Sequence, residues 1–129
     1  MALRVLVVDD SAVMRSMVVK VLHMTGLPIV EIREAENGKA GLDALEEGGI
    51  DLALVDINMP VMDGLTMLEK LRADQEYGRK AAVILLTNIN DPEKVAQATD
   101  AGSYDFLVKS DWNIEDVVRK IKTRLGVPL

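Results

Sequence analysis

The sequence has no cysteine, a single histidine and only four aromatic residues, which are one tryptophan, two tyrosines and one phenylalanine. The absence of cysteine excludes a disulfide framework and a thiol nucleophile, and it fits a reducing compartment such as the cytoplasm. No apolar run approaches the roughly 18 residues of a membrane-spanning helix, and the N-terminal residues do not form a secretory signal. The net charge of −6 argues against non-specific nucleic-acid binding. We therefore expect a cytoplasmic protein with no membrane span and no direct contact with nucleic acid.

Five short apolar runs alternate along the chain with stretches of helical spacing, and they are Leu3–Val8, Ile29–Ile32, Leu52–Val55, Ala82–Leu86 and Tyr104–Val108. Most of these runs show no polar alternation, which predicts strands buried on both faces, whereas the second is interleaved with charges and predicts an edge strand. This order predicts one α/β domain over residues 1–129, a flavodoxin-like (βα)5 sandwich with helices on both faces of a parallel sheet. Strand order 2-1-3-4-5 is the commoner arrangement for such a sheet.

Capping residues predict where four of the helices begin, and these are Ser11, Asn37, Asp91 and Asn113. Another helix is expected from Leu65 to about Asp74, after the tight turn at Asp63-Gly64. The predicted helix ends lie near Gly26, Gly48-Gly49, Gly102 and Gly126. The helix that begins at Asp91 has the weakest apolar face, so we expect it to be the least firmly packed.

Polar residues follow four of the apolar runs, and they are Asp9 with Asp10, Asp56, Thr87 and Lys109. Because parallel strands joined by crossovers end at the same edge of a sheet, these side chains are expected to converge there. Singly, each has a common structural role, as a helix cap, a strand residue or a solvated charge. Chance convergence at all of these strand ends is much less common, so the set as a whole predicts a functional site.

Three carboxylates at close quarters repel, at a cost of about 4 kcal/mol for two charges 4 Å apart at an effective dielectric of 20. A bound cation removes that cost, and hard oxygen ligands without histidine or cysteine select Mg²⁺, Mn²⁺ or Ca²⁺ over zinc. A small number of dedicated ligands favours Mg²⁺. Lys109 and Thr87 add donors for an anionic group. An aspartate in such a site can act as a nucleophile and form an acyl phosphate.

Four segments together resemble the receiver domain of two-component response regulators, over nearly all of the chain: Val7–Ser11, Leu54–Gly64, Leu86-Thr87 and Phe106–Lys109. The resemblance implies a signalling phosphoacceptor, not an enzyme, in which Asp56 takes a phosphoryl group from a sensor histidine kinase or a histidine phosphotransfer domain. It also implies that Asp10, Asp56 and the backbone carbonyl of Asn58 ligate Mg²⁺, with Mn²⁺ as the alternative metal. Asp9 contributes through a water molecule.

The same resemblance assigns roles to the last two motifs. Lys109 pairs with the phosphoryl group, and Thr87 bonds it and moves. Phe106 takes the position of an aromatic switch, although it also fits a core aromatic of the last strand. A downstream protein is expected to dock on the face made by the fourth helix, the fifth strand and the fifth helix.

The sequence departs from the family pattern beside the site. Ser110 stands where proline usually follows the lysine, and Asn88 stands where a small residue usually follows the threonine. We expect Asn58, Asn88 and Ile89 to control how easily water reaches the acyl phosphate, and therefore its lifetime. An apolar Ile89 offers no hydrogen bond to an attacking water and predicts a long-lived phosphorylated form.

Two other classes of function are compatible with the residues. An aspartate-nucleophile phosphatase of the haloacid-dehalogenase type also uses aspartate, Mg²⁺, threonine and lysine, but it typically carries a second aspartate where this chain has Asn58. A receiver-like scaffold that no longer takes phosphate is disfavoured because the acceptor set is complete. The sequence fits either a free-standing regulator that acts by docking or a receiver from a longer protein.

Overall fold

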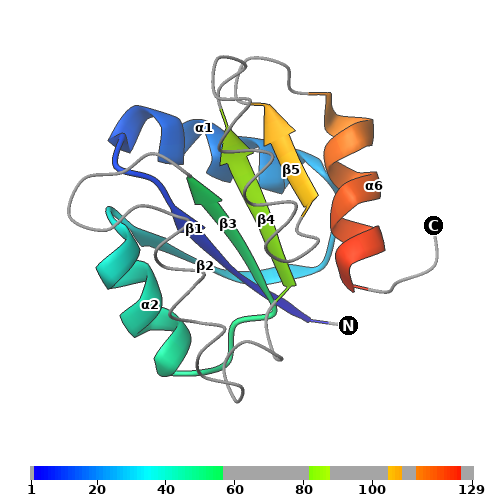
Figure 1. Cartoon of the computed structure of the whole chain (residues 1–129). Helices are drawn as coiled ribbons and strands as arrows, with labels where there is room; N and C mark the ends of the chain where they lie inside the picture. Colours follow the sequence, from blue (N-terminus) through cyan, green and yellow to red (C-terminus); the bar gives the residue numbers. More distant parts are fainter. Residues whose placement is uncertain (1, 57–81, 88–104, 109–112, 126–129) are drawn as a thin grey trace.

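The computed structural model describes residues 2–56, 82–87, 105–108 and 113–125, with the backbone alone for Ala82, Thr87, residues 105–108 and Arg124. The elements in chain order are β1 (Leu3–Val8), α1 (Ala12–Met24), β2 (Ile29–Ala35), α2 (Gly38–Glu46), β3 (Leu52–Asp56), β4 (Ala82–Thr87), β5 (Asp105–Val108) and α6 (Ile114–Leu125). Figure 1 shows the strands running side by side with helices on either side of them. The predicted helices from Leu65 and from Asp91 lie outside the described residues.

The strands form one five-stranded sheet in the order β2-β1-β3-β4-β5, and every pairing in it is parallel. This arrangement confirms the predicted order and the prediction of β2 as an edge strand. At the carboxyl edge, Val8 of β1 lies opposite Val55 of β3, and Thr87 of β4 lies opposite Val108 of β5. Consequently the chain leaves β1, β3, β4 and β5 at the same edge of the sheet.

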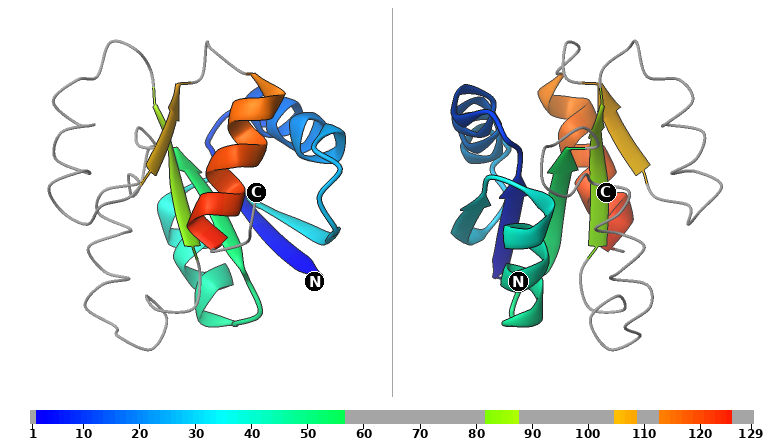
Figure 2. Two further views of the ribbon diagram at one scale, coloured as in Figure 1. Left: turned by 90° about the vertical axis from the view of Figure 1, so that its right-hand side faces the viewer. Right: turned by 60° about the vertical axis from the view of Figure 1, so that its left-hand side comes forward.

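Helices cover both faces of the sheet, α2 on one and α1 with α6 on the other (Figure 2). Side chains alternate across each strand, so successive residues of β1 and β3 enter two separate cores. On the α2 side, Leu6 and Val55 pack with Leu45. On the other side, buried residues of β1, β3 and β4 pack against Val18 and Leu22 of α1 and Val117 and Ile121 of α6. The central strands are therefore buried on both faces, as their unbroken apolar runs predict.

Each of the three described helices, α1, α2 and α6, begins at a predicted capping residue, while Asp91 lies outside the described residues. Ser11 Oγ accepts from the Met14 backbone N–H at 3.2 Å, and Asn37 Oδ1 accepts from that of Ala40 at 2.8 Å. Asn113 Oδ1 accepts from the backbone N–H of Glu115 at 2.9 Å. Each cap satisfies a donor that the first helical turn leaves without a partner.

The predicted extent of the second strand needs a small correction. β2 continues past Ile32 to Ala35, because pairing with β1 extends to that residue and overrides the charged side chains between them. β5 is described over Asp105–Val108, and Tyr104, the predicted first residue of this strand, lies outside the described residues. Within the described ranges, no helix has the length and the apolar character required to cross a membrane.

Candidate functional site

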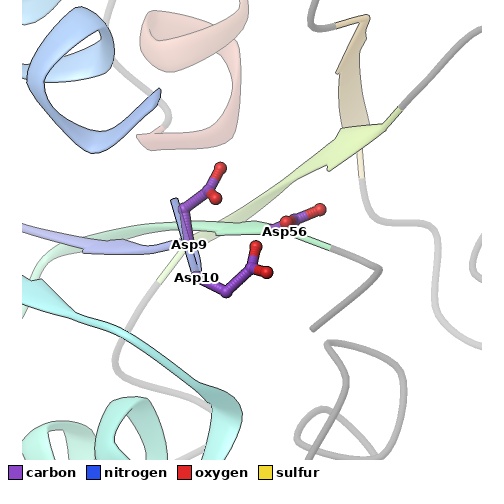
Figure 3. A group of neighbouring side chains, drawn as sticks. All are labelled: Asp9, Asp10 and Asp56. Atoms are coloured by element: carbon purple, nitrogen blue, oxygen red, sulfur yellow. The ribbon is translucent and has the colours of Figure 1, made fainter. Parts of the chain in front are cut away.

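Three carboxylates meet where β1 and β3 end. Asp9 and Asp10 directly follow β1, and Asp56 is the last residue of β3, the neighbouring strand. Each of the three offers one carboxylate oxygen, and these oxygens all lie within 4.8 Å of one another. Figure 3 shows the Asp10 side chain extending from the end of β1 toward Asp56. The convergence predicted from the strand ends is confirmed for these residues.

The three carboxylates differ in their access to solvent. Asp9 is fully buried and Asp56 is 2% exposed, whereas Asp10 is exposed. At an effective dielectric of 20, two unit charges 4.8 Å apart repel by about 3.5 kcal/mol. A divalent cation beside them removes this cost. The three ligands are hard carboxylate oxygens, and the exposed Asp10 leaves one side of the cluster open to solvent. This arrangement fits a Mg²⁺ ion that keeps several of its water ligands.

Asp9 makes hydrogen bonds through its backbone N–H, its side chain and its backbone carbonyl. Its N–H donates to the carbonyl of Ala35 on β2 at 3.0 Å, and its Oδ1 accepts from the backbone N–H of Ser11 at 2.9 Å. Its carbonyl accepts from Nη1 of Arg15 at 2.7 Å. No motif or spacing in the sequence distinguishes Arg15 from other charged residues on a helix, so its contact with Asp9 could not be predicted.

The other strand ends place two further candidates by their backbone. Thr87 is the last residue of β4, and its partner Val108 is the residue before Lys109. Asp56 pairs with Leu86, the residue before Thr87. In the pairing of β4 with β5, Phe106 lies opposite Leu85. Thr87 therefore reaches the same edge as the three aspartates, whereas Asn58, Asn88, Ile89 and Lys109 lie outside the described residues and remain predictions from the sequence.

The family model of the response regulator receiver domain matches residues 5–122. Among curated relatives, the chemotaxis protein CheY of Bacillus subtilis is 38% identical over 109 residues, which cover 84% of this chain and 87% of the relative. The chemotaxis protein CheY-3 of Vibrio cholerae is 33% identical over 107 residues, covering 83% of this chain and 80% of that protein.

Solved structures show the same likeness. The chain superimposes on Vibrio cholerae chemotaxis protein CheY4 with a TM-score of 0.80 at 30% identity, covering 97% of this chain and 100% of that one. A putative response regulator from Chloroflexus aurantiacus gives a TM-score of 0.85 at 25% identity, over 98% and 99% of the two chains. The chain thus belongs to the response regulator receiver domain family, and it is a CheY-like signalling domain of two-component systems.

Proposed function

We propose that Asp56 is the phosphoacceptor of this receiver domain. The observation that carries the proposal is the position of Asp56: a buried carboxylate at the end of a central strand, with oxygens of two further carboxylates within 4.8 Å. Such a cluster is unfavourable unless a cation neutralises it, and it places a nucleophilic oxygen beside that cation. The phosphoryl donor is a phosphohistidine on a sensor histidine kinase or a histidine phosphotransfer domain.

The transfer requires one nucleophile and one leaving group. A carboxylate oxygen of Asp56 forms a bond to phosphorus while the N–P bond of the phosphohistidine breaks. The imidazole nitrogen leaves with the bonding electron pair and takes up a proton, and Asp56 becomes an acyl phosphate. In-line alignment of the attacking oxygen and the leaving nitrogen supplies much of the rate, because phosphoryl transfer depends mainly on positioning and charge stabilisation.

The neighbouring residues bind the metal and stabilise the negative charge of the phosphoryl group. Asp10, Asp56 and the backbone carbonyl of Asn58 would hold the metal, with Asp9 acting through a water molecule. Mg²⁺, or Mn²⁺ in its place, would supply positive charge to the equatorial oxygens of the phosphoryl group. Lys109 pairs with the same oxygens, and the hydroxyl of Thr87 donates a hydrogen bond to one of them.

The signal leaves the domain as a change of binding surface. Thr87 and Phe106 belong to adjacent strands, β4 and β5. Movement of Thr87 toward the phosphoryl group opens space into which Phe106 turns. The face made by the helix predicted to begin at Asp91, β5 and α6 then binds a downstream protein. A cytoplasmic location fits this role, because histidine kinases present their phosphohistidine there.

Incubation with acetyl phosphate and Mg²⁺, followed by intact mass spectrometry, tests the acceptor. The mass should rise by one phosphoryl group in the wild type, and neither Asp56→Asn nor EDTA-treated protein should show the increase. Asp43→Asn, which changes an exposed carboxylate on α2, is the matched control and should label fully. Full labelling of Asp56→Asn at another site would show that the assignment of Asp56 is wrong.

An aspartate-nucleophile phosphatase is the competing activity. The amide of Asn58 cannot act as the general acid and base that such an enzyme needs two residues after its nucleophile. We therefore expect no sustained turnover of a generic phosphate ester, only slow loss of the phosphoryl group from Asp56. Steady-state release of inorganic phosphate from such an ester would favour the enzyme instead.

A further inference from the structure

Arg15 connects the acidic site to the edge of the sheet. It lies in the first turns of α1, and its side chain is 17% exposed. Its Nη1 donates to the carbonyl oxygen of Asp9 at 2.7 Å, while its Nε donates to Oε1 of Glu34 on β2 at 3.2 Å. The backbone N–H of Arg15 donates to the carbonyl of Ser11 at 2.9 Å. Main chain and side chain of one residue therefore both hold the turn between β1 and α1.

We infer that Arg15 is a positioning residue for the metal site, acting through the peptide group that joins Asp9 to Asp10. This inference rests on the proposed function of the three aspartates. The carbonyl that accepts from Arg15 belongs to the peptide bond between Asp9 and Asp10, and that bond is planar. Fixing its oxygen fixes the plane, and so sets the direction in which the chain continues to Asp10.

Asp10 needs this support more than its neighbours do. Asp9 and Asp56 are buried within the fold, whereas Asp10 is exposed and follows the end of the strand. A flexible exposed carboxylate loses conformational entropy when it binds a metal, and a fixed backbone reduces that loss. Groups that orient metal ligands in this way typically change metal affinity by about 10–100-fold when they are removed.

The geometry requires an arginine. Its planar guanidinium presents several N–H groups in fixed directions, so one side chain reaches the Asp9 carbonyl and the Glu34 carboxylate at once. A lysine ammonium carries the same charge but is a single point on a flexible stem. Glu34 in turn fixes the guanidinium from β2, which makes the Arg15–Glu34 ion pair part of the support.

Positioning and charge predict opposite outcomes. Arg15 is a cation near a cation site, so removal of its charge alone would strengthen Mg²⁺ binding by lowering the repulsion. Loss of positioning would weaken binding. Arg15→Lys keeps the charge and removes the guanidinium geometry, so it isolates the positioning effect.

The test is isothermal titration of the full chain with Mg²⁺ alone, together with urea unfolding in EDTA. We expect the Kd for Mg²⁺ to rise about tenfold in Arg15→Lys. The rise should be smaller in Arg15→Met, because loss of the charge offsets part of the lost positioning, and it should be a few-fold in Glu34→Gln. Arg119→Met removes an exposed arginine of α6, changes the net charge as Arg15→Met does, and should leave the Kd unchanged.

A purely structural role for Arg15 would lower the urea midpoint and leave the Kd of the folded variants as in the wild type. That result, or tighter binding in Arg15→Lys, would overturn the inference while the proposed function stands. A wild type that binds no Mg²⁺ would instead overturn the proposed function. If Arg15→Met does not fold, Arg15→Lys and Glu34→Gln decide the question.

Discussion

Replacement of Asp10 by asparagine should stabilise the metal-free protein. The change removes one of three negative charges whose oxygens lie within 4.8 Å of one another, and so removes two repulsive pairs. Each pair costs about 3.5 kcal/mol at an effective dielectric of 20 and about 0.9 kcal/mol at the dielectric of water. Since Asp10 is exposed, the lower value is the better guide, and the expected gain in the free energy of unfolding is about 1–2 kcal/mol.

Magnesium should reduce or reverse this difference. A ligand that binds only the folded state stabilises it by RT ln(1 + [L]/Kd), which is about 1.4 kcal/mol when Mg²⁺ is at ten times its Kd. The wild type gains this stabilisation, while Asp10→Asn lacks one ligand and gains much less. The variant should therefore be the more stable protein in EDTA and lose its advantage at high Mg²⁺.

Urea unfolding measures both effects. The two proteins are compared in EDTA at low salt, in EDTA with 1 M NaCl, and in Mg²⁺. The gain should shrink in 1 M NaCl because the Debye length falls to about 3 Å. Asp43→Asn on α2 makes the same change in net charge away from the site and should change stability by less than about 0.5 kcal/mol. A variant no more stable than the wild type in EDTA, or an equal gain in Asp43→Asn, would refute the electrostatic reasoning.

Three further predictions concern lifetime, capping and pH. Ile89→Glu should hasten loss of the phosphorylated mass under constant Mg²⁺, since a carboxylate there could hold the attacking water; equal decay would refute this. Asn37→Ala should cost about 1 kcal/mol in urea unfolding, because it removes the cap on the Ala40 N–H. The hydrogen bond from Arg33 lowers the pKa of the Glu31 carboxyl below its ordinary value. The Arg33–Glu31 interaction therefore stabilises the fold at pH values above the ordinary pKa of glutamate, and this stabilisation is lost as the pH falls through the lowered pKa. NMR titration should show that lowered pKa in the wild type, and Arg33→Gln should return it toward the ordinary value.

The sequence alone determined the elements whose signals are local. Unbroken apolar runs identified the buried strands, because a strand covered on both faces has no polar side to alternate with. Ser11, Asn37 and Asn113 marked helix starts, since a cap depends only on the next two or three backbone N–H groups. The meeting of Asp9, Asp10 and Asp56 also followed, because parallel strands must end at one edge.

The tertiary structure alone decided how the acidic residues differ and what holds them. Asp9 and Asp10 are adjacent and chemically identical, yet one is buried and the other exposed, since this depends on where the chain leaves β1 to enter α1. The contacts of Arg15 likewise depend on how α1 lies against the strands: its Nη1 reaches the Asp9 carbonyl after β1, and its Nε reaches Glu34 on β2, 19 residues away in sequence. Periodicity reports which face of an element is apolar, but it carries no information about which polar groups of different elements come within hydrogen-bonding distance.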